Sequence, residues 1–189
     1  MDNIDKKIIS ELQKNGRATL KQLGEAVGFT IMGVKRRVEN LFSKNLIKVS
    51  ALVNIDALNL HTALILLELE NREALEKVLK TFKECPRVVY VFLMLAGYNL
   101  AALVIAEDLD TLESESMEKC SLRSQEGVRR SEFYPIGSIH YSPFLPIREN
   151  LATKERNIAP CNADCGSCGR YHAQKCLGCP ATKYYRGPL

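Results

Sequence analysis

The chain has 189 residues, of which 46% are hydrophobic and 25% charged, and this balance excludes a largely disordered protein and supports a core in one large domain or two small ones. The formal net charge is only +4, but it is unevenly distributed. Residues 1–50 carry ten Lys and Arg against five Asp and Glu, residues 51–150 ten against fifteen, and residues 151–189 six against two. A basic N-terminal module beside an acidic body is typical of a protein that binds phosphates at one end.

The sequence carries no sign of export or membrane insertion. Its first residues, Met1 to Lys7, are charged from the start, and no apolar run approaches the ~18 residues of a membrane span. We therefore expect a cytoplasmic protein with no membrane partner. In that reducing compartment, seven cysteines favour metal ligands or core packing over disulfides.

A first helix is predicted near the N-terminus. Ile4, Ile8 and Leu12 share one helical face, and Asp2 with Asp5 places negative charge at the start, where the helix dipole favours it. Together with two further helices, this segment suffices for a small core.

A helix-turn-helix is predicted from Thr19 to Lys44. Thr19 and Gln22 have the spacing of a capping box, in which both side chains satisfy backbone groups at the start of a helix. Gly28 follows where a sharp turn needs a positive φ. Thr30 then caps a second helix, whose apolar positions recur at spacings of three and four and are expected to face inward. These positions are Ile31, Val34, Val38 and Leu41.

The second helix of this pair is expected to read double-stranded DNA. A helix fits the major groove, where Lys and Arg reach phosphates and guanine edges while a partner helix crosses the backbone. Its outward side is basic, and Arg36 and Arg37 are the leading expected contacts. The expected DNA-binding residues are Thr30, Met32, Lys35, Arg36, Arg37 and Asn40. The competing interpretation is an amphipathic helical pair with surface lysines and no DNA function.

The segment from Ile47 to Ile55 alternates enough to predict a short wing or linker strand. Residues 1–53 are therefore assigned to a winged helix-turn-helix domain. The turn residues near its end mark the start of a second domain, which we expect to cover residues 54–141.

This second domain has the predicted order β-α-β-β-α-β. Strands are expected at His61 to Leu69, Val88 to Leu95, Leu100 to Ala106 and Val128 to Ile136, with a helix capped by Asn71 and a helix from Leu109 to Leu122 capped by Asp108. The order is that of a ferredoxin-like fold, in which both helices cover one face of the sheet. Apolar residues on the other face would meet water, which predicts a homodimer or a higher homo-oligomer. The fold class is thus α+β.

Over about residues 2 to 137 the chain resembles the Lrp/AsnC (feast/famine) transcription regulators. The resemblance rests on Asp5-Lys6-Lys7-Ile8-Ile9, Asn15-Gly16-Arg17, the run from Val34 to Leu41, Tyr98-Asn99-Leu100 and Ala106-Glu107-Asp108-Leu109. It implies an N-terminal winged helix-turn-helix, a C-terminal ligand-sensing domain, dimers that assemble into octamers or other higher species, and responses to amino acids.

In this family the effector pocket usually lies between dimers, near the loop that joins the second and third strands. The resemblance places Leu95, Gly97, Tyr98 and Asn99 in or beside that pocket. Many members have Gly, a polar residue and then Tyr-Asp before the third strand, whereas this chain has Ala96 before Gly97, and Asn for Asp. The acidic group that would meet an amino-acid ammonium is therefore missing, and Gly97 with Asn99 fits a simple tight turn equally well.

The same loop also looks like that of the AsnC-related sirohaem decarboxylases, which have a histidine close to the Tyr-Asn pair. This chain has Gly97 there. His61 and His140 remain as acid or base candidates, but neither lies in a recognisable catalytic string, and lone histidines are more often structural. We therefore expect a regulator and not an enzyme, with a tetrapyrrole decarboxylase as the alternative.

Five cysteines gather after a proline-containing linker at residues 142–160. Their spacing is C-x3-C-x2-C-x7-C-x2-C, and they are Cys161, Cys165, Cys168, Cys176 and Cys179. A C-x2-C pair directs two thiolates at one ion, so residues 161–189 predict a cysteine-rich segment that binds zinc through the last four, with Cys161 or His172 as substitutes. The alternative is a [4Fe–4S] cluster held by the first three and either Cys176 or Cys179. A disulfide-linked or metal-free tail also stays open.

The remaining two cysteines, Cys85 and Cys120, are interpreted as small buried hydrophobes. The tail also resembles short cysteine-rich domains of unsettled function in bacteria and archaea. With few large apolar side chains it should depend on its metal for order. Its thiolates suggest that it staples the assembly or senses metal, oxygen or redox state, and a metal- or redox-sensing interaction protein without DNA binding is a further alternative.

Overall fold

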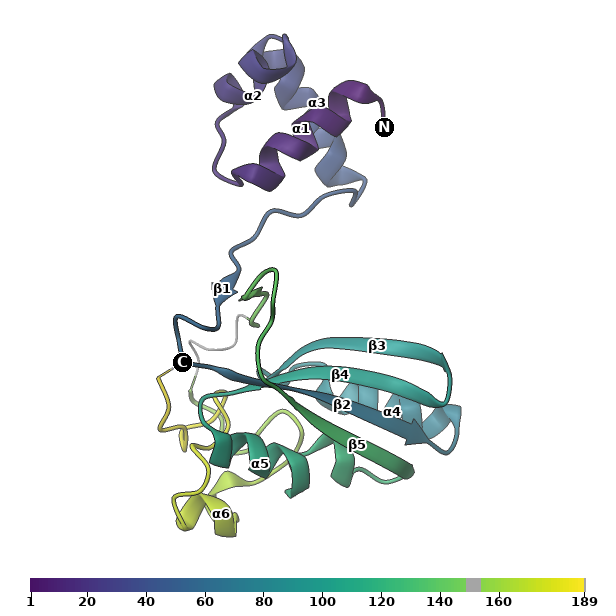
Figure 1. The fold of residues 1–189 in the computed structure, drawn as a ribbon, viewed down its shortest axis with the longest axis vertical. Coiled ribbons are helices and arrows are strands. Elements are labelled where there is room, and N and C mark those ends of the chain that lie inside the picture. Colours follow the sequence, from purple (N-terminus) through teal and green to yellow (C-terminus); the bar gives the residue numbers. More distant parts are fainter. Residues whose placement is uncertain (149–153, 189) are drawn as a thin grey trace. The chain divides into compact units, whose positions relative to one another are not determined.

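The computed structural model describes residues 1–148 and 154–188; residues 149–153 of the expected linker and Leu189 of the expected cysteine-rich segment lie outside the described residues. The chain divides into two compact units, Met1–Ala51 and Leu52–Leu189 (Figure 1). In the described parts, no helix combines the length and the apolar character that a membrane crossing requires.

The first unit is a bundle of three helices. They are α1 (Asn3–Lys14), α2 (Leu20–Val27) and α3 (Ile31–Ser43). Their apolar faces meet in one small core, which confirms the predicted three-helix packing. The buried side chains of this core are Ile8, Leu23, Val27, Val34 and Leu41.

Each of these helices begins at a side-chain cap. The Asp5 N–H donates to Asp2 Oδ1 at 2.9 Å, and the Gln22 N–H donates to Thr19 Oγ1 at 3.2 Å. Thr19 therefore forms the predicted capping box. Gly28, with φ of 73°, ends α2 in the left-handed conformation that the turn into α3 requires.

The predicted wing is wrong. Residues Met1–Ala51, all of which the structure describes, contain no strand. Only Val53–Asn54 (β1) is extended and paired, and it pairs with Phe144–Leu145 (β6) inside the second unit. A wing needs two adjacent strands after the helix-turn-helix. The single strand β1 instead forms its backbone hydrogen bonds with β6, which follows about 90 residues later in the sequence.

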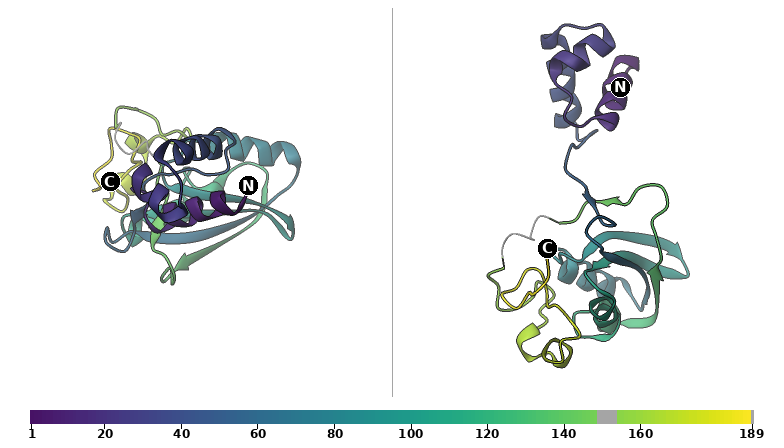
Figure 2. Two further views of the ribbon diagram at one scale, coloured as in Figure 1. Left: turned by 90° about the horizontal axis from the view of Figure 1, so that it is seen from above. Right: turned by 60° about the vertical axis from the view of Figure 1, so that its left-hand side comes forward.

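The second unit is built on an antiparallel sheet with strand order β3-β4-β2-β5. The strands are β2 (His61–Leu69), β3 (Val88–Ala96), β4 (Tyr98–Ala106) and β5 (Val128–Ile136), and the helices are α4 (Arg72–Phe82) and α5 (Leu109–Met117). The predicted β-α-β-β-α-β order is confirmed, and Figure 2 shows the sheet and its helices from two further sides.

The second helix of this unit is shorter than predicted. It ends at Met117 instead of Leu122, and Leu122–Ser124 forms a separate 3₁₀ turn. Glu118 leaves the helical conformation with ψ of 171°, and Ser121 caps the new turn by accepting a hydrogen bond from the Arg123 N–H. The apolar stripe beyond Met117 is weak, so the burial of Leu122 in the core determines the path of the chain there.

The sheet has one covered face and one largely uncovered face. Directly paired residues of an antiparallel sheet point to the same side. The covered side carries Ala63, Ile65, Leu67, Leu100, Ala102 and Val104, against which α4 and α5 pack. The opposite side, here called the outer face, carries Leu64, Leu66, Tyr90, Phe92, Leu103 and Tyr134. The segment around β6 covers only one end of it, where Leu145 packs near Ile105.

Residues 154–188, here called the tail, pack beside α5 on the rest of the second unit, here called the body (Figure 1). The tail contains a 3₁₀ turn, Cys165–Ser167 (η3), and a one-turn helix, Gly169–His172 (α6). Ala159 and Cys161 are buried in the same core as the covered face of the sheet. The tail is thus an integral layer of this unit.

Candidate functional site

Helix α3 has one solvent-exposed side, which is polar apart from Met32. Met32 is 72% exposed, Arg36 and Asn40 are exposed, and Lys35 lies 3.8 Å from Glu39 one helical turn away. Within residues 1–148 and 154–188, Arg36 makes no ion pair. Its guanidinium is therefore available to an external anion.

Arg37 lies differently from the other expected DNA contacts. Its Nη1 donates to Asp2 Oδ2 at 2.7 Å and to Asp5 Oδ1 at 2.8 Å, and its guanidinium stacks 5.2 Å from the ring centroid of Phe29. The hydrogen bond to Asp2, followed by that to Asp5, raises the pKa of Arg37. Arg37 thus ties α3 to the start of α1, and its role as a DNA contact stays a prediction.

Two residues at the start of α3 differ in their roles. Thr30 accepts a hydrogen bond from the Gly33 N–H at 3.2 Å and caps the helix. Ile31 was expected to face inward, which is wrong, because it is 51% exposed. It is the first helical residue, and the α3 residues that pack into the core with α1 and α2 are Val34, Val38 and Leu41. With Met32 it forms an apolar tip on α3 that the helical periodicity did not reveal.

The expected effector residues form the tight turn between β3 and β4. Gly97 has φ of 67°, and the side chain of Leu95 is fully exposed. Asn99 accepts a hydrogen bond from the Leu69 N–H at 2.9 Å and donates to the Leu69 carbonyl at 2.8 Å. Asn99 therefore fastens the start of β4 to the end of β2, and effector binding at this turn stays a prediction.

Tyr98 belongs to a polar group on the sheet that sequence reasoning missed. The hydroxyls of Tyr98 and Tyr134 both donate to the carboxylate of Glu132. Arg130 Nη2 donates to the same carboxylate at 2.9 Å and its guanidinium lies 5.0 Å from the Tyr98 ring centroid. Desolvation and the hydrogen bond to Glu132 raise the pKa of Tyr98 to about 12. The period-two alternation of β5, which puts Glu132 and Tyr134 on one face, was the available signal.

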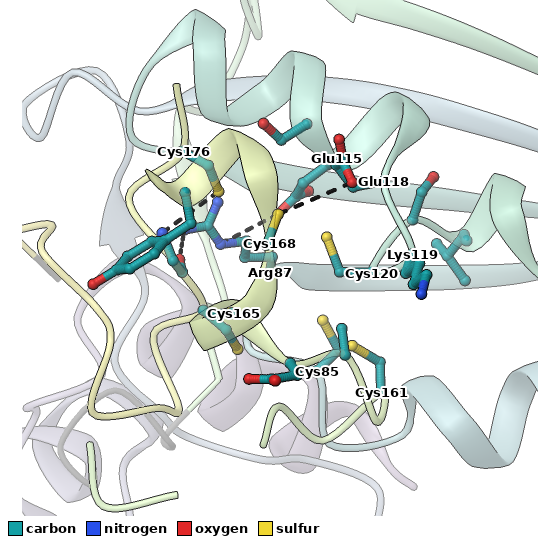
Figure 3. A pocket seen from close by; sticks show the side chains of 18 of the residues that line it. Cys85, Arg87, Glu115, Glu118, Lys119, Cys120, Cys161, Cys165, Cys168 and Cys176 are labelled. Carbon is teal, nitrogen blue, oxygen red and sulfur yellow. Dashed lines mark hydrogen bonds and ion pairs between the residues drawn. The ribbon is translucent and has the colours of Figure 1, made fainter. Parts of the chain in front are cut away.

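A cavity of about 370 Å³ lies between the tail and the body of the second unit. Every cysteine of the chain lines it: Cys85, Cys120, Cys161, Cys165, Cys168, Cys176 and Cys179. Figure 3 shows six of these side chains around the opening. In the part of the chain that the structure describes, no three His, Cys, Asp or Glu side chains are close enough to hold one metal ion.

The two cysteines of the body are the residues that the sequence did not connect with the tail. Cys85 follows α4 and is buried, and Cys120 follows α5 and is partly buried. Cys85 is buried as expected, whereas Cys120 is only partly buried, and both also line the cavity. His172, a suggested substitute ligand, has its Nε2 2.7 Å from the Gly166 carbonyl and is not among the residues that line the cavity.

A buried ion cluster lies beside this cavity. Arg87 Nη2 is 2.8 Å from Glu107 Oε2, and Arg87 Nε is 3.2 Å from Glu115 Oε1. The same guanidinium donates to the tail carbonyl of Gly178 at 2.6 Å. Burial alone would lower the pKa of Arg87, but the two carboxylates more than offset this and raise it. Burial also raises the pKa of Glu115 to about 7.

Polar side chains of α5 hold the tail in place. The buried Thr111 Oγ1 accepts a hydrogen bond from the Leu177 N–H at 3.1 Å, and the buried Ser114 hydroxyl donates to the Lys175 carbonyl at 2.9 Å. Arg170 Nε donates to Ser114 Oγ at 2.6 Å. These bonds satisfy polar groups that would be costly to bury alone. They also explain why α5 has such a weak apolar stripe.

The thiols of the cavity are strongly desolvated. Burial raises the pKa of five of them, Cys85, Cys120, Cys161, Cys165 and Cys179, the last to about 12. The negative charge of the Glu115 carboxylate, followed by that of neighbouring thiolates, further raises the pKa of Cys85 and Cys120. A bound cation would reverse this balance, because it stabilises thiolates directly.

The chain is similar to known transcriptional regulators. Residues 1–41 match the AsnC-type helix-turn-helix domain. The chain is 37% identical over 118 residues to an uncharacterized HTH-type transcriptional regulator of Pyrococcus abyssi, an alignment that covers 60% of this chain and 76% of that protein.

Solved structures share the fold. The transcriptional regulator NMB0573 of Neisseria meningitidis, in complex with L-Met, superposes with a TM-score of 0.68 at 23% identity, over 78% of this chain and 97% of that one. AsnC of E. coli superposes with a TM-score of 0.66 at 17% identity, over 74% and 94%. These likenesses show a common fold of helix-turn-helix and ferredoxin-like units.

Proposed function

Because the chain belongs to the Lrp/AsnC family of DNA-binding transcription regulators, we propose that it reads its operator with the exposed side of α3. The observation that carries this proposal is the row of exposed side chains on that helix, with Arg36, which has no ion-pair partner among the described residues, at its centre. Lys35 and Arg36 would supply phosphate and guanine contacts, and Asn40 a contact to a base or phosphate.

The two arginines of α3 have separate roles in this proposal. Arg36 contacts DNA, while Arg37 holds α3 against the acidic start of α1. The apolar tip formed by Ile31 and Met32 suits contact with thymine methyl groups, because it is exposed at the N-terminal end of the helix, the end that contacts base edges in this motif. Thr30 contributes through its capping bond.

We also propose that the protein acts as a homodimer or a larger homo-oligomer through the outer face of its sheet. Tyr90 is 42%, Phe92 52% and Tyr134 49% exposed on that face, which supports a further protein surface as its cover. Two copies of α3 would then read half-sites about one DNA turn apart, or a multiple of it, in a roughly palindromic operator.

A small effector is proposed to act at the β3–β4 turn. The regulator from Neisseria meningitidis was solved in complex with L-Met. In this chain Tyr98, Arg130 and Glu132 offer an aromatic ring, a cation and a carboxylate beside the turn. These groups support recognition of a small polar molecule by hydrogen bonds and charge.

The DNA-binding proposal is tested by Arg36→Ala. The substitution should weaken binding about tenfold or more to a duplex that the unchanged protein has selected from a random library, and it should reduce the salt slope by about one. Arg72→Ala, which removes the same charge from a side chain that is 89% exposed on α4, is the matched control and should bind normally. Unchanged affinity of Arg36→Ala in a fluorescence anisotropy titration would refute the assignment.

A further inference from the structure

We propose that the cavity between the tail and the body binds a [4Fe–4S] cluster through Cys161, Cys165, Cys168 and one thiolate of the pair Cys176 and Cys179. This site lies wholly within Leu52–Leu189 and is independent of the DNA-reading role of α3. The proposal assigns a cofactor to an otherwise regulatory chain.

The cysteine thiols that line the cavity support a sulfur-ligated cofactor. Seven thiols from five separate places in the sequence converge on one cavity. Thiolates are soft ligands that select zinc, Cu(I) or iron–sulfur clusters over hard cations. Core packing does not require thiols from separate parts of a chain to line one cavity, whereas a cofactor held by four thiolates requires four of them there.

The size of the cavity separates the two leading candidates. Four thiolates around one zinc lie at about 2.3 Å from the metal, hence only about 3.8 Å from one another. In a cubane cluster each thiolate binds a different iron, so the cofactor needs more room. The cavity of about 370 Å³ that the thiols line has room for four irons and four sulfides.

The backbone around the expected ligands is shaped for a bound sulfur centre. Cys165–Ser167 forms a 3₁₀ turn in which the Cys168 N–H donates to the Cys165 carbonyl at 3.3 Å, so that both side chains leave one tight turn. Gly178, between Cys176 and Cys179, has φ of 82°, and a Cβ there would lie 2.8 Å from the Tyr184 carbonyl oxygen. Only glycine fits this close turn without strain.

A backbone N–H group already points at one of the sulfurs, because the Gly178 N–H donates to Cys176 Sγ at 3.4 Å. Such bonds stabilise thiolates and are among the groups that tune iron–sulfur centres. The tail therefore offers spacing, room and a hydrogen-bond donor together.

The full chain, purified without oxygen and incubated with ferrous iron and sulfide, tests the proposal. It should take up about four irons and four acid-labile sulfides per chain and become brown, with a broad visible absorption band that dithionite bleaches. A parallel sample receives zinc alone. Tight uptake of one zinc per chain, with no coloured species formed from iron and sulfide, would overturn the cluster assignment.

Two variants locate the ligands. Cys165→Ser should lose most of the iron and sulfide, whereas the matched variant Cys120→Ser, at a lining cysteine that is not proposed as a ligand, should retain them. Equal loss in both variants contradicts the ligand set. Far-UV circular dichroism before reconstitution shows whether each variant is folded, and the stoichiometry of the unchanged protein tests the cofactor in any case. Arg36→Ala should keep its iron, which separates failure of this proposal from failure of DNA binding.

Discussion

At the scale of single residues, two buried carboxylates share one guanidinium beside the cysteine cavity. Glu107 and Glu115 both lie against Arg87, so the cluster holds an excess negative charge in a region from which water is excluded. Burial raises the pKa of Glu115 to about 7, and the negative charge of Glu107 adds to this rise. The positive charge of Arg87 opposes it but does not cancel it.

The raised pKa predicts a specific pH dependence. The folded state holds the Glu115 proton more tightly than the unfolded state, so this residue's contribution to stability is largest below the usual glutamate pKa of 4.5 and is lost as the pH rises through about 7. Glu115→Gln keeps an oxygen acceptor for Arg87 but cannot ionise. At about pH 8 it should be more stable than the unchanged protein, by up to about 3 kcal/mol, and less so at about pH 5.

Tyrosine fluorescence during urea unfolding reports on the second unit, which contains Glu115, because all seven tyrosines lie beyond residue 51. Glu73→Gln, at an exposed position of α4, is the control and should leave the pH profile unchanged. Profiles of Glu115→Gln and the unchanged protein that run parallel from about pH 5 to about pH 8 would show that Glu115 does not titrate in this range.

At the scale of elements, the approach of α2 to α3 depends on one glycine. A Cβ on the buried Gly24 would lie 2.7 Å from the Phe29 carbonyl oxygen in the turn between the two helices. Backbone cannot move aside as a flexible side chain can. The helix-turn-helix therefore needs Gly24 for close contact, just as it needs Gly28 for its backbone conformation.

Gly24→Ala should accordingly destabilise the helix-turn-helix by about 1 to 3 kcal/mol, although alanine is the better helix former. Gly33→Ala is the matched control, since its Cβ would meet only side-chain atoms, at 3.3 Å from Phe29 Cδ1 and Thr30 Oγ1. Hydrogen exchange of peptides from residues 20–43 in the full chain measures both. Faster exchange in Gly33→Ala than in Gly24→Ala would contradict the role of the close contact.

At the scale of the whole molecule, the outer face of the sheet governs assembly in our proposal. Phe92→Asp places a charge in the middle of that apolar surface, where burial against a second copy would leave it without a partner. We expect the dimer dissociation constant to rise about 100-fold or more in sedimentation velocity experiments. Leu58→Asp, at an exposed apolar position in the turn after β1, should not change it. An unchanged dissociation constant for Phe92→Asp would exclude this face.

Features that depend on neighbours a few residues apart could be predicted from the amino-acid sequence. The capping pairs of Thr19 and Asn71, the left-handed Gly28 and the boundaries of β2 and β5 all follow from interactions within one turn or one strand. Periodicity then ordered the strands and helices correctly, because alternation and helical spacing report which side of each element is buried.

Which distant groups come into contact depends on tertiary packing. Arg37 finds Asp2 across 35 residues, β1 pairs with β6 instead of forming a wing, and Cys85 and Cys120 join the tail cysteines around one cavity. The pattern of residues within one helix or strand does not predict such contacts, because they depend on how whole elements pack. The spacing of the tail cysteines indicated a metal, and the cavity that all seven cysteines line is the ground for the cluster that we propose.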